Sequence, residues 1–163
     1  MTDDTLYMRQ AIAASREAML RGDMPFGATL VKDGQVLQVS GNTQRSTGDC
    51  MAHAEVELIR VARRKLGASA LQGATVYASG EPCAMCSGTM FWAGITRVVL
   101  GATTADIAQA LGDPTLPITC SEVLASCQPA VQVDGPLLRD EAVAVLRDFA
   151  QHAAQHAAQK QSP

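Results

Sequence analysis

The hydrophobic positions at the start of the chain recur at helical spacing. Apolar and small residues fall at intervals of three or four from Met8 to Met19, and Gly22 follows them. Residues three and four apart share one face of a helix. The periodicity therefore predicts a helix over about 3–21 that buries one side and ends at the glycine.

Two short β-rich runs come next. The runs 28–32 and 35–40 carry valine, leucine and threonine, and the dipeptide Asp33-Gly34 between them suits the tight turn of a two-residue hairpin. Residues 41–51 are mostly polar. They are predicted to form a loop.

Helices and strands alternate in the middle of the chain. A helix is predicted from about Ala52 to Gly67, with cations gathered near its C-terminal end, where they suit the helix dipole. A strand over 75–79, a helix over about 84–93 and a strand over 97–101 follow. A hairpin followed by such alternation predicts a mixed sheet with helices on both faces.

The last third of the sequence is less regular until its final helix. Prolines interrupt the stretch before a predicted strand over 130–133, and an apolar stripe from Leu138 to Phe149 predicts a terminal helix. Beyond it, Gln-His-Ala-Ala occurs twice in succession. We expect 1–150 to form one domain and 151–163 a low-complexity tail that frays.

Composition narrows the class of protein. Of 163 residues, 47% are hydrophobic and 18% are charged, and the net charge is −3 with a pI near 5.5. A basic surface for nucleic acid is not indicated, and no apolar run approaches the ~18 residues that span a bilayer. The acidic start lacks the features of a signal peptide, so a cytoplasmic location is expected.

One histidine and two cysteines are candidate metal ligands. Five cysteines cannot all pair, and Cys83 and Cys86 form a Cys-x-x-Cys, which in a cytosolic chain indicates metal or redox chemistry. Both lie at the start of a predicted helix, after the carboxyl end of a strand, and a helix N-terminus favours thiolate. His53 is the only histidine before the polar tail.

Glu55 adds a proton-transfer group to this arrangement. Two thiolates and one imidazole leave a fourth position of zinc open, which is the pattern of catalytic zinc sites. Positions two apart on a regular helix point in different directions, so His53 and Glu55 can converge only at the open first turn. There Glu55 would take a proton from water and return it to a departing amine.

Two other interpretations of these residues stay open. The Cys-x-x-Cys alone would suit a redox pair, and Cys50 as a fourth ligand would close the site into a structural zinc centre. Neither needs Glu55 or an open coordination position. A catalytic zinc site is therefore favoured over a zinc-stabilised structural domain.

Further short segments extend the pattern beyond the ligands. The segments are Pro25–Ala28, Val31–Gly34, Asn42, Ala52–Glu55 and Glu81–Cys86. The motif His-x-Glu followed by Pro-Cys-x-x-Cys is typical of zinc nucleobase deaminases. Together the segments resemble the cytidine and deoxycytidylate deaminase superfamily, and they are most similar to its branch of bacterial guanine deaminases and tRNA adenosine deaminases. The resemblance covers about 6–101 well.

The resemblance implies a fold, a reaction and an assembly. It implies an α/β/α sandwich with a five-stranded sheet, usually as a homodimer, that releases ammonia from an amidine-type ring carbon. The roles that transfer are zinc ligand for His53, Cys83 and Cys86 and proton shuttle for Glu55.

The same resemblance indicates which residues contact the substrate. It places Asn42 on the base or its sugar and the backbone amide of Ala54 on the substrate. Phe26 and Trp92 fall where relatives line the ring or stack on it. Asn42 would also suit a turn, and both aromatic residues would also suit the core.

The substrate is predicted to be a small nucleobase or nucleoside, with a guanine-like purine favoured. Relatives that edit tRNA usually carry a smaller aliphatic residue in place of Phe26, and the acidic pI also disfavours RNA. A tRNA adenosine-to-inosine editing enzyme and a cytosine-type pyrimidine deaminase stay open. The catalytic residues do not separate these bases.

Two features depart from the guanine deaminases that the chain resembles. Those enzymes end in an aromatic-bearing segment over the active site, whereas 151–163 contains no aromatic residue. The segment from Gly112 to Thr115 also replaces the acidic loop that would read the amino edge of guanine. Asp113, or else Asp106, is expected to take that role, although a loop aspartate also suits a cap or turn.

Overall fold

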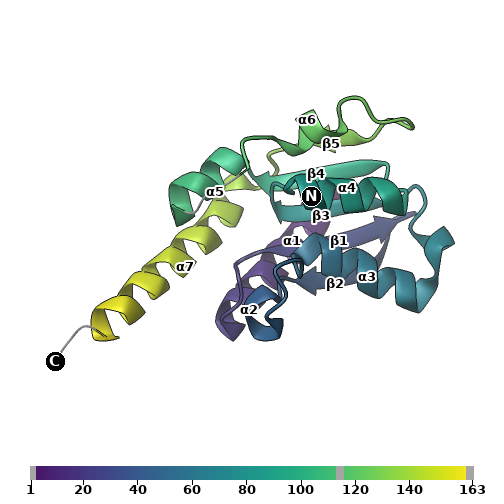
Figure 1. The fold of residues 1–163 in the computed structure, drawn as a ribbon. Coiled ribbons are helices and arrows are strands. Elements are labelled where there is room, and N and C mark those ends of the chain that lie inside the picture. Colours follow the sequence, from purple (N-terminus) through teal and green to yellow (C-terminus); the bar gives the residue numbers. More distant parts are fainter. Residues whose placement is uncertain (1–2, 113–115, 161–163) are drawn as a thin grey trace.

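The chain folds around one mixed sheet with the strand order β2-β1-β3-β4-β5 (Figure 1). The computed structural model describes residues 3–112 and 116–160. The strands are β1 (Gly27–Lys32), β2 (Gln35–Gly41), β3 (Thr75–Gly80), β4 (Arg97–Ala102) and β5 (Gln132–Asp134). β1 pairs antiparallel with β2 and β3, whereas β3, β4 and β5 run parallel. The predicted mixed five-stranded sheet is confirmed.

Helices cover both faces of this sheet and make the predicted three-layer α/β/α sandwich (Figure 1). The helices are α1 (Asp3–Arg21), α2 (Gln44–Thr47), α3 (Ala54–Leu66), α4 (Ala84–Ala93), α5 (Thr104–Leu111), α6 (Cys120–Leu124) and α7 (Arg139–Lys160), with a 3-10 turn at Ala68–Ala70. α1 and α7 share a core that contains Met8 and Leu146, and α3 and α4 share one that contains Leu58 and Met90. Within the described ranges, no helix combines the length and apolarity that crossing a bilayer requires.

The predicted boundaries agree closely with the structure up to β4. Asp33 and Gly34 both have positive φ, 51° and 75°, as a two-residue hairpin turn favours. The helix predicted from Ala52 begins two residues later at Ala54. The difference arises because His53 keeps an extended backbone and serves as the N-cap.

Three helical features differ from the sequence predictions. α2 lies within the segment predicted as a loop, and α5 and α6 lie in the region predicted as irregular. α7 continues through the Gln-His-Ala-Ala repeat to Lys160 instead of ending near Phe149. Alanine has the highest helix propensity, which favours this continuation. In Figure 1 the C-terminal part of α7 extends away from the body.

An ionic cluster joins α1 to the sheet at the end of β4 away from Cys83. Arg97 donates two hydrogen bonds to the carboxylate of Asp4, at 3.0 and 2.9 Å, and one to Asp134 at 2.7 Å. The hydroxyl of Tyr77 also donates to Asp4. Hydrogen bonds from Arg97 and Tyr77 lower the pKa of Asp4, and the cluster therefore favours its ionised form.

Candidate active site

Two helix N-termini meet beside the carboxyl end of β3. His53 is the N-cap of α3 and Cys83 is the N-cap of α4, both with extended backbone. Cys86 follows in the first turn of α4 and is buried. The partial positive charge of a helix N-terminus favours thiolate at the sulfurs.

The three predicted ligands lie at the separations of a tetrahedral zinc site. Nδ1 of His53 is 3.5 Å from Sγ of Cys86 and 3.8 Å from Sγ of Cys83, and the two sulfurs are 3.7 Å apart. Zinc–ligand bonds of ~2.3 Å to sulfur and ~2.0 Å to nitrogen give tetrahedral edges of about 3.8 Å (S–S) and about 3.6 Å (S–N). The donor set therefore fits zinc.

No fourth cysteine joins this group in the described part of the chain. The cluster of metal-ligating side chains contains His53, Cys83 and Cys86. Cys50 is exposed and lies outside it. The structure therefore leaves the fourth coordination position free of a protein ligand from Cys50, as a catalytic zinc site requires.

The two sulfurs of the cluster titrate as a pair. A hydrogen bond with Cys86 lowers the pKa of Cys83 to about 4, and the same contact raises the pKa of Cys86 far above its ordinary value. The hydrogen bond with Cys83 also raises the pKa of His53. The contact therefore favours thiolate at Cys83, and binding of a divalent cation requires both sulfurs to be deprotonated.

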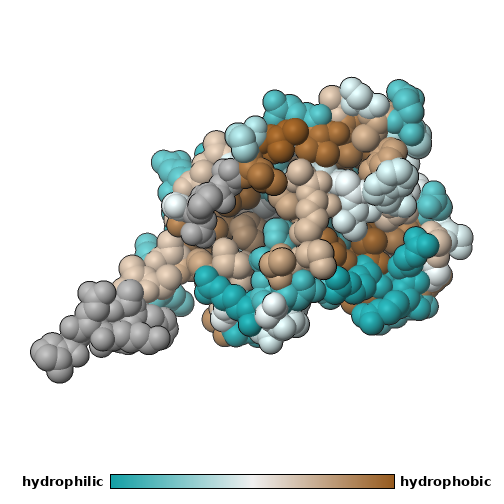
Figure 2. All heavy atoms as spheres, in the orientation of Figure 1, coloured by the Kyte–Doolittle hydropathy of each residue, from teal (hydrophilic) through white to brown (hydrophobic). Residues whose placement is uncertain are grey.

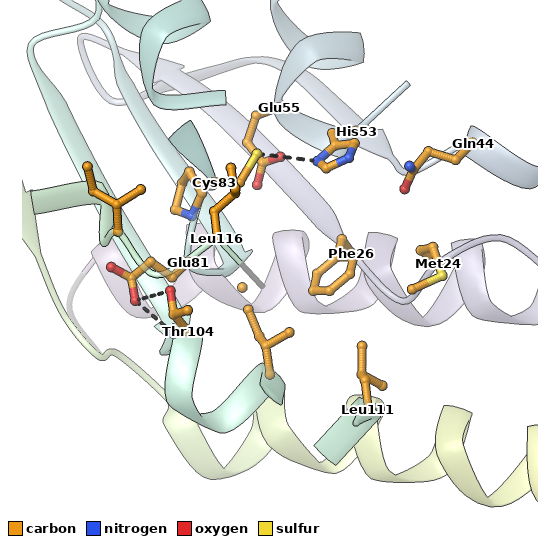
Figure 3. A pocket seen from close by; sticks show the side chains of 14 residues that line it. Met24, Phe26, Gln44, His53, Glu55, Glu81, Cys83, Thr104, Leu111 and Leu116 are labelled. Atoms are coloured by element: carbon orange, nitrogen blue, oxygen red, sulfur yellow. Dashed lines mark hydrogen bonds between the residues drawn. The ribbon is translucent and has the colours of Figure 1, made fainter. Parts of the chain in front are cut away.

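Glu55 is a buried carboxyl group beside the ligands. It occupies the second position of α3, two residues after the His53 N-cap, and is only 5% exposed. Burial raises the pKa of Glu55, although hydrogen bonds with its own backbone and with Cys86 oppose the shift. A carboxyl group with a raised pKa is suited to taking up and returning a proton. Figure 3 shows Glu55 and His53 side by side.

A cavity of about 310 Å³ opens beside these residues. Figure 2 shows this face of the molecule hollowed between largely apolar side chains. The described lining residues are Met24, Phe26, Gln44, His53, Glu55, Gly80, Glu81, Pro82, Cys83, Thr104, Ile107, Leu111, Leu116 and Ile118. None of these lining residues is a lysine or an arginine.

Phe26 lies in the cavity wall against the end of β3. A Cβ added to Gly80 would lie 2.9 Å from two ring carbons of Phe26 and 3.2 Å from Cδ1 of Ile107. Such distances are too short for a side chain, so the glycine allows the ring to approach the strand closely. The structure therefore brings the predicted Phe26 to the cavity.

Asn42 is fully buried behind Gln44. Nδ2 of Asn42 donates to Oε1 of Gln44 at 2.7 Å, and the backbone N–H of Gln44 donates to Oδ1 of Asn42 at 2.9 Å. Nε2 of Gln44 also donates to the backbone oxygen of Cys50 at 3.0 Å. Gln44, which the sequence analysis does not single out, lines the cavity in front of Asn42.

Among the other residues predicted to contact the substrate, the structure does not bring Trp92 or Asp106 to the cavity. Ala54 is the first residue of α3, where backbone N–H groups have no partner within the helix. Trp92 is 82% exposed on α4, and the structure does not bring it to the cavity. Asp113 lies outside the described residues. Asp106 does not line the cavity, because it caps the first turn of α5 and pairs with Arg139.

Sequence reasoning missed the apolar wall of the cavity. Ile107 and Leu111 lie on α5, and Leu116 and Ile118 follow it in the region predicted as irregular. A capping box from Thr103 to the acid three residues later marks the start of α5 and is a sequence signal that would have located it.

Comparison with protein families and curated proteins agrees with the zinc site. Residues 1–102 match the family described as the cytidine and deoxycytidylate deaminase zinc-binding region. The chain is 35% identical over 153 residues to a probable cytosine deaminase of Schizosaccharomyces pombe, with 90% of this chain and 91% of that protein covered. It is 42% identical over 102 residues to a tRNA-specific adenosine deaminase of Agrobacterium fabrum, with 63% and 67% covered. Identity to the guanine deaminase of Bacillus subtilis is 38% over 105 residues, with 64% and 67% covered.

Solved structures share the fold. A structure from studies of tRNA:A34 deaminases aligns with a TM-score of 0.72 at 34% identity, over 86% of this chain and 99% of the other. A guanine deaminase from Nitrosomonas europaea aligns with a TM-score of 0.77 at 25% identity, over 89% and 83%. The similar proteins thus include deaminases named for cytosine, guanine and tRNA adenosine.

Proposed function

The chain belongs to the cytidine and deoxycytidylate deaminase family, and we propose that it deaminates a small nucleobase or nucleoside, with a guanine-like purine as the first candidate. The size and the lining of the cavity are the main support for this proposal. Its volume of about 310 Å³ lies at the lower end of the ~300–1,000 Å³ of small-molecule sites. Its described lining is mostly apolar and contains no lysine or arginine, which suits a neutral heterocycle better than a phosphate.

The residues of the site divide the reaction between them. His53, Cys83 and Cys86 would hold the zinc, which would supply a Lewis acid next to the cavity. Glu55 takes a proton from the attacking water as the C–O bond forms and returns it to the amino group as the C–N bond breaks. One water is consumed and ammonia leaves; the second proton of the water ends on the ring nitrogen as the ring carbon becomes a carbonyl.

Polar and aromatic groups around the cavity are proposed to orient the base. After its bonds to Asn42 and Cys50, the carboxamide of Gln44 keeps one N–H and one lone pair for a ring edge. The backbone amide of Ala54 is proposed to donate to the substrate, and the ring of Phe26 to line one face of the base. The presence of Phe26 in the cavity supports a purine over the tRNA substrate.

A cytosine-type pyrimidine is the second candidate. The similarity to the Schizosaccharomyces pombe protein extends over 90% of this chain, including the part after β4 that forms the apolar wall. The match to the Bacillus subtilis guanine deaminase covers 64%. The longer similarity favours cytosine, whereas Phe26 favours a purine.

Adenosine in tRNA is the third candidate, favoured by the 42% identity to the Agrobacterium fabrum protein. The net charge of −3 and a described cavity lining without lysine or arginine oppose it, because RNA binding relies on contacts of these residues to phosphates. A homodimer, which the family resemblance implies, stays a prediction.

Release of ammonia from a panel of substrates tests the proposal. The panel contains guanine, cytosine, adenine, their nucleosides and a tRNA anticodon stem-loop. We expect the zinc-loaded protein to release ammonia from guanine, and Glu55→Gln to release almost none. Turnover of cytosine alone would transfer the assignment to the second candidate, and inosine formed in the RNA would overturn the small-molecule proposal.

A further inference from the structure

Glu81 joins three separate parts of the chain at the edge of the cavity. It directly follows β3 and lines the cavity. Its Oε2 accepts hydrogen bonds from the backbone N–H and the hydroxyl of Thr104, at 2.8 and 2.9 Å (Figure 3). Its Oε1 accepts from the backbone N–H of Cys120 at 3.0 Å. Because Thr104 begins α5 and Cys120 begins α6, one carboxylate ties the first turns of both helices to the end of β3.

The segment between these two anchors supplies the apolar wall. Ile107 and Leu111 come from α5, and Leu116 and Ile118 lie between α5 and α6. Leu116 is 60% exposed and Ile118 is 39% exposed. Both side chains are only partly buried, so their position also depends on the ends of the segment that carries them.

The anchor and the metal ligands belong to the same short stretch of chain. Glu81 stands two residues before Cys83. Its carboxylate oxygens accept from backbone N–H groups that the first turn of a helix leaves without an intrahelical partner. A displacement of Glu81 would therefore change the distance between the wall and the zinc ligands.

We propose that Glu81 is a positioning residue, which holds the apolar wall of the cavity in place against the zinc ligands and thereby sets the fit of the substrate. It takes no part in proton transfer, which belongs to Glu55. The statement about substrate fit rests on the proposed function. The statement about the wall rests on the three hydrogen bonds alone and is testable without a substrate.

The test is the variant Glu81→Gln, which keeps the size of the side chain but turns one acceptor oxygen into an N–H₂ group facing an N–H donor. We expect backbone amides of the described residues in 104–124 (104–112 and 116–124) to exchange hydrogen about tenfold faster, with exchange in α3 unchanged and zinc still at about one per chain. For the base turned over fastest in the ammonia assay, KM should rise about tenfold while kcat stays within about threefold.

Glu122→Gln is the matched control. Oε2 of Glu122 accepts from the backbone N–H and hydroxyl of Thr119 at 2.8 and 2.7 Å, which is the same chemistry on the exposed side of α6. Glutamine also serves in a capping box. Exchange and KM should therefore stay near the values of the unaltered protein. If Glu81→Gln fails to fold, Thr104→Val removes only the hydroxyl bond and should accelerate exchange within 104–111.

Several outcomes would overturn the proposal. Unchanged exchange in 104–124 would show that Glu81 does not hold the wall, and faster exchange with an unchanged KM would show that the wall does not set substrate fit. Loss of zinc from Glu81→Gln with faster exchange in α3 and α4 would assign Glu81 to the metal site instead. A protein inactive on every base would overturn the proposed function, while the exchange data would still decide the role of Glu81.

Discussion

Nδ1 of His53 lies 3.5 Å from Sγ of Cys86, although 33 positions separate the two residues in the sequence. They meet because α3 and α4 lie on the same face of the sheet and begin beside each other. Each helix offers a ligand from its N-cap, and α4 offers a second from its first turn. The site is thus built at the ends of two packed helices, which gives it a rigid support.

The purified protein should contain about one zinc per chain, because a Cys₂His set with an open position binds a single ion. His53→Ala and Cys83→Ala should lose the metal. Cys50→Ala is the control and should keep it, because Cys50 is exposed and outside the cluster. The measurement is metal analysis by mass spectrometry after gel filtration. Loss of zinc from the Cys50 variant would support a closed structural site.

Glu55→Gln should keep the zinc and the fold but lower turnover by at least ~100-fold, the usual scale for a positioned proton shuttle. The amide preserves the shape of the buried side chain and removes its basicity. Glu57→Gln changes a neighbouring carboxylate that does not line the cavity and should leave turnover near normal. The measurement is the rate of ammonia release at saturating substrate, compared between the two variants and the unaltered protein. Near-normal turnover of the Glu55 variant would exclude it from the mechanism.

The metal site is the part of the molecule that the sequence predicts best. His53, Cys83 and Cys86 are residue types with few alternative roles at these spacings, and the turn at Asp33-Gly34 is a local signal. The starts of the two helices beside the ligands are likewise predicted from local residues. Each of these motifs is short and local, so a single chain reveals it, although the histidine and the two cysteines come from segments about 30 positions apart.

The cavity wall is the part that the sequence does not reveal. Leu116 and Ile118 stand in no regular pattern, and they line the cavity between two helices whose first turns bond to Glu81, far from them in sequence. Trp92 is a residue that the sequence analysis places at the substrate and the structure does not. It falls where relatives line the ring or stack on it, but its side chain is exposed to solvent here. Such placements depend on long-range contacts, which local patterns do not encode.

Asp4→Asn should destabilise the protein at neutral pH and cost progressively less in acid. The folded-state pKa of Asp4 is lowered, so its stabilisation is present above the unfolded pKa of ~3.9 and is lost as the pH falls through the folded value. The urea midpoint should fall by about 0.3 M at pH 7, with a smaller difference near pH 3.5.

Glu17→Gln, which changes an exposed carboxylate on the same helix, is the control for this titration. Acid also protonates the cysteine thiolates, but equally in the variant and the unaltered protein. Comparing their urea midpoints at the same pH therefore cancels this contribution. A midpoint difference for Asp4→Asn that is equal at both pH values would show that the ion pair with Arg97 is not its source.

Salt should have little effect on substrate binding. An RNA substrate would bind more weakly as salt rises, because its phosphates release counterions on contact with lysine and arginine. For a neutral base in a cavity whose described lining has no lysine or arginine, KM should change by less than about twofold between 50 and 300 mM salt. A steep rise in KM, or inosine in the stem-loop RNA, would favour the tRNA-editing candidate.

The last prediction separates the roles of Asn42 and Gln44. Asn42→Ala should reduce kcat/KM by ~10- to 100-fold without loss of zinc, because an unpaired buried polar group costs roughly 1–3 kcal/mol. Gln44→Ala should have a similar effect. Ser46→Ala is the control on the same helix, since its hydroxyl bonds to Asp23 and does not line the cavity. The kcat/KM of Ser46→Ala should stay near that of the unaltered protein.

The value of kcat/KM for the double variant of Asn42 and Gln44 decides between the possible roles of Asn42. Both polar ends of the Asn42 side chain bond to Gln44, so Asn42 is expected to act by holding the Gln44 amide against the ring edge. Removing both residues should then cost little more than removing either one. The loss should also be larger for the true substrate than for an analogue without the matching polar edge. Losses that multiply would mean that Asn42 contacts the base itself, and equal losses across all bases would mean that the pair only shapes the loop before His53.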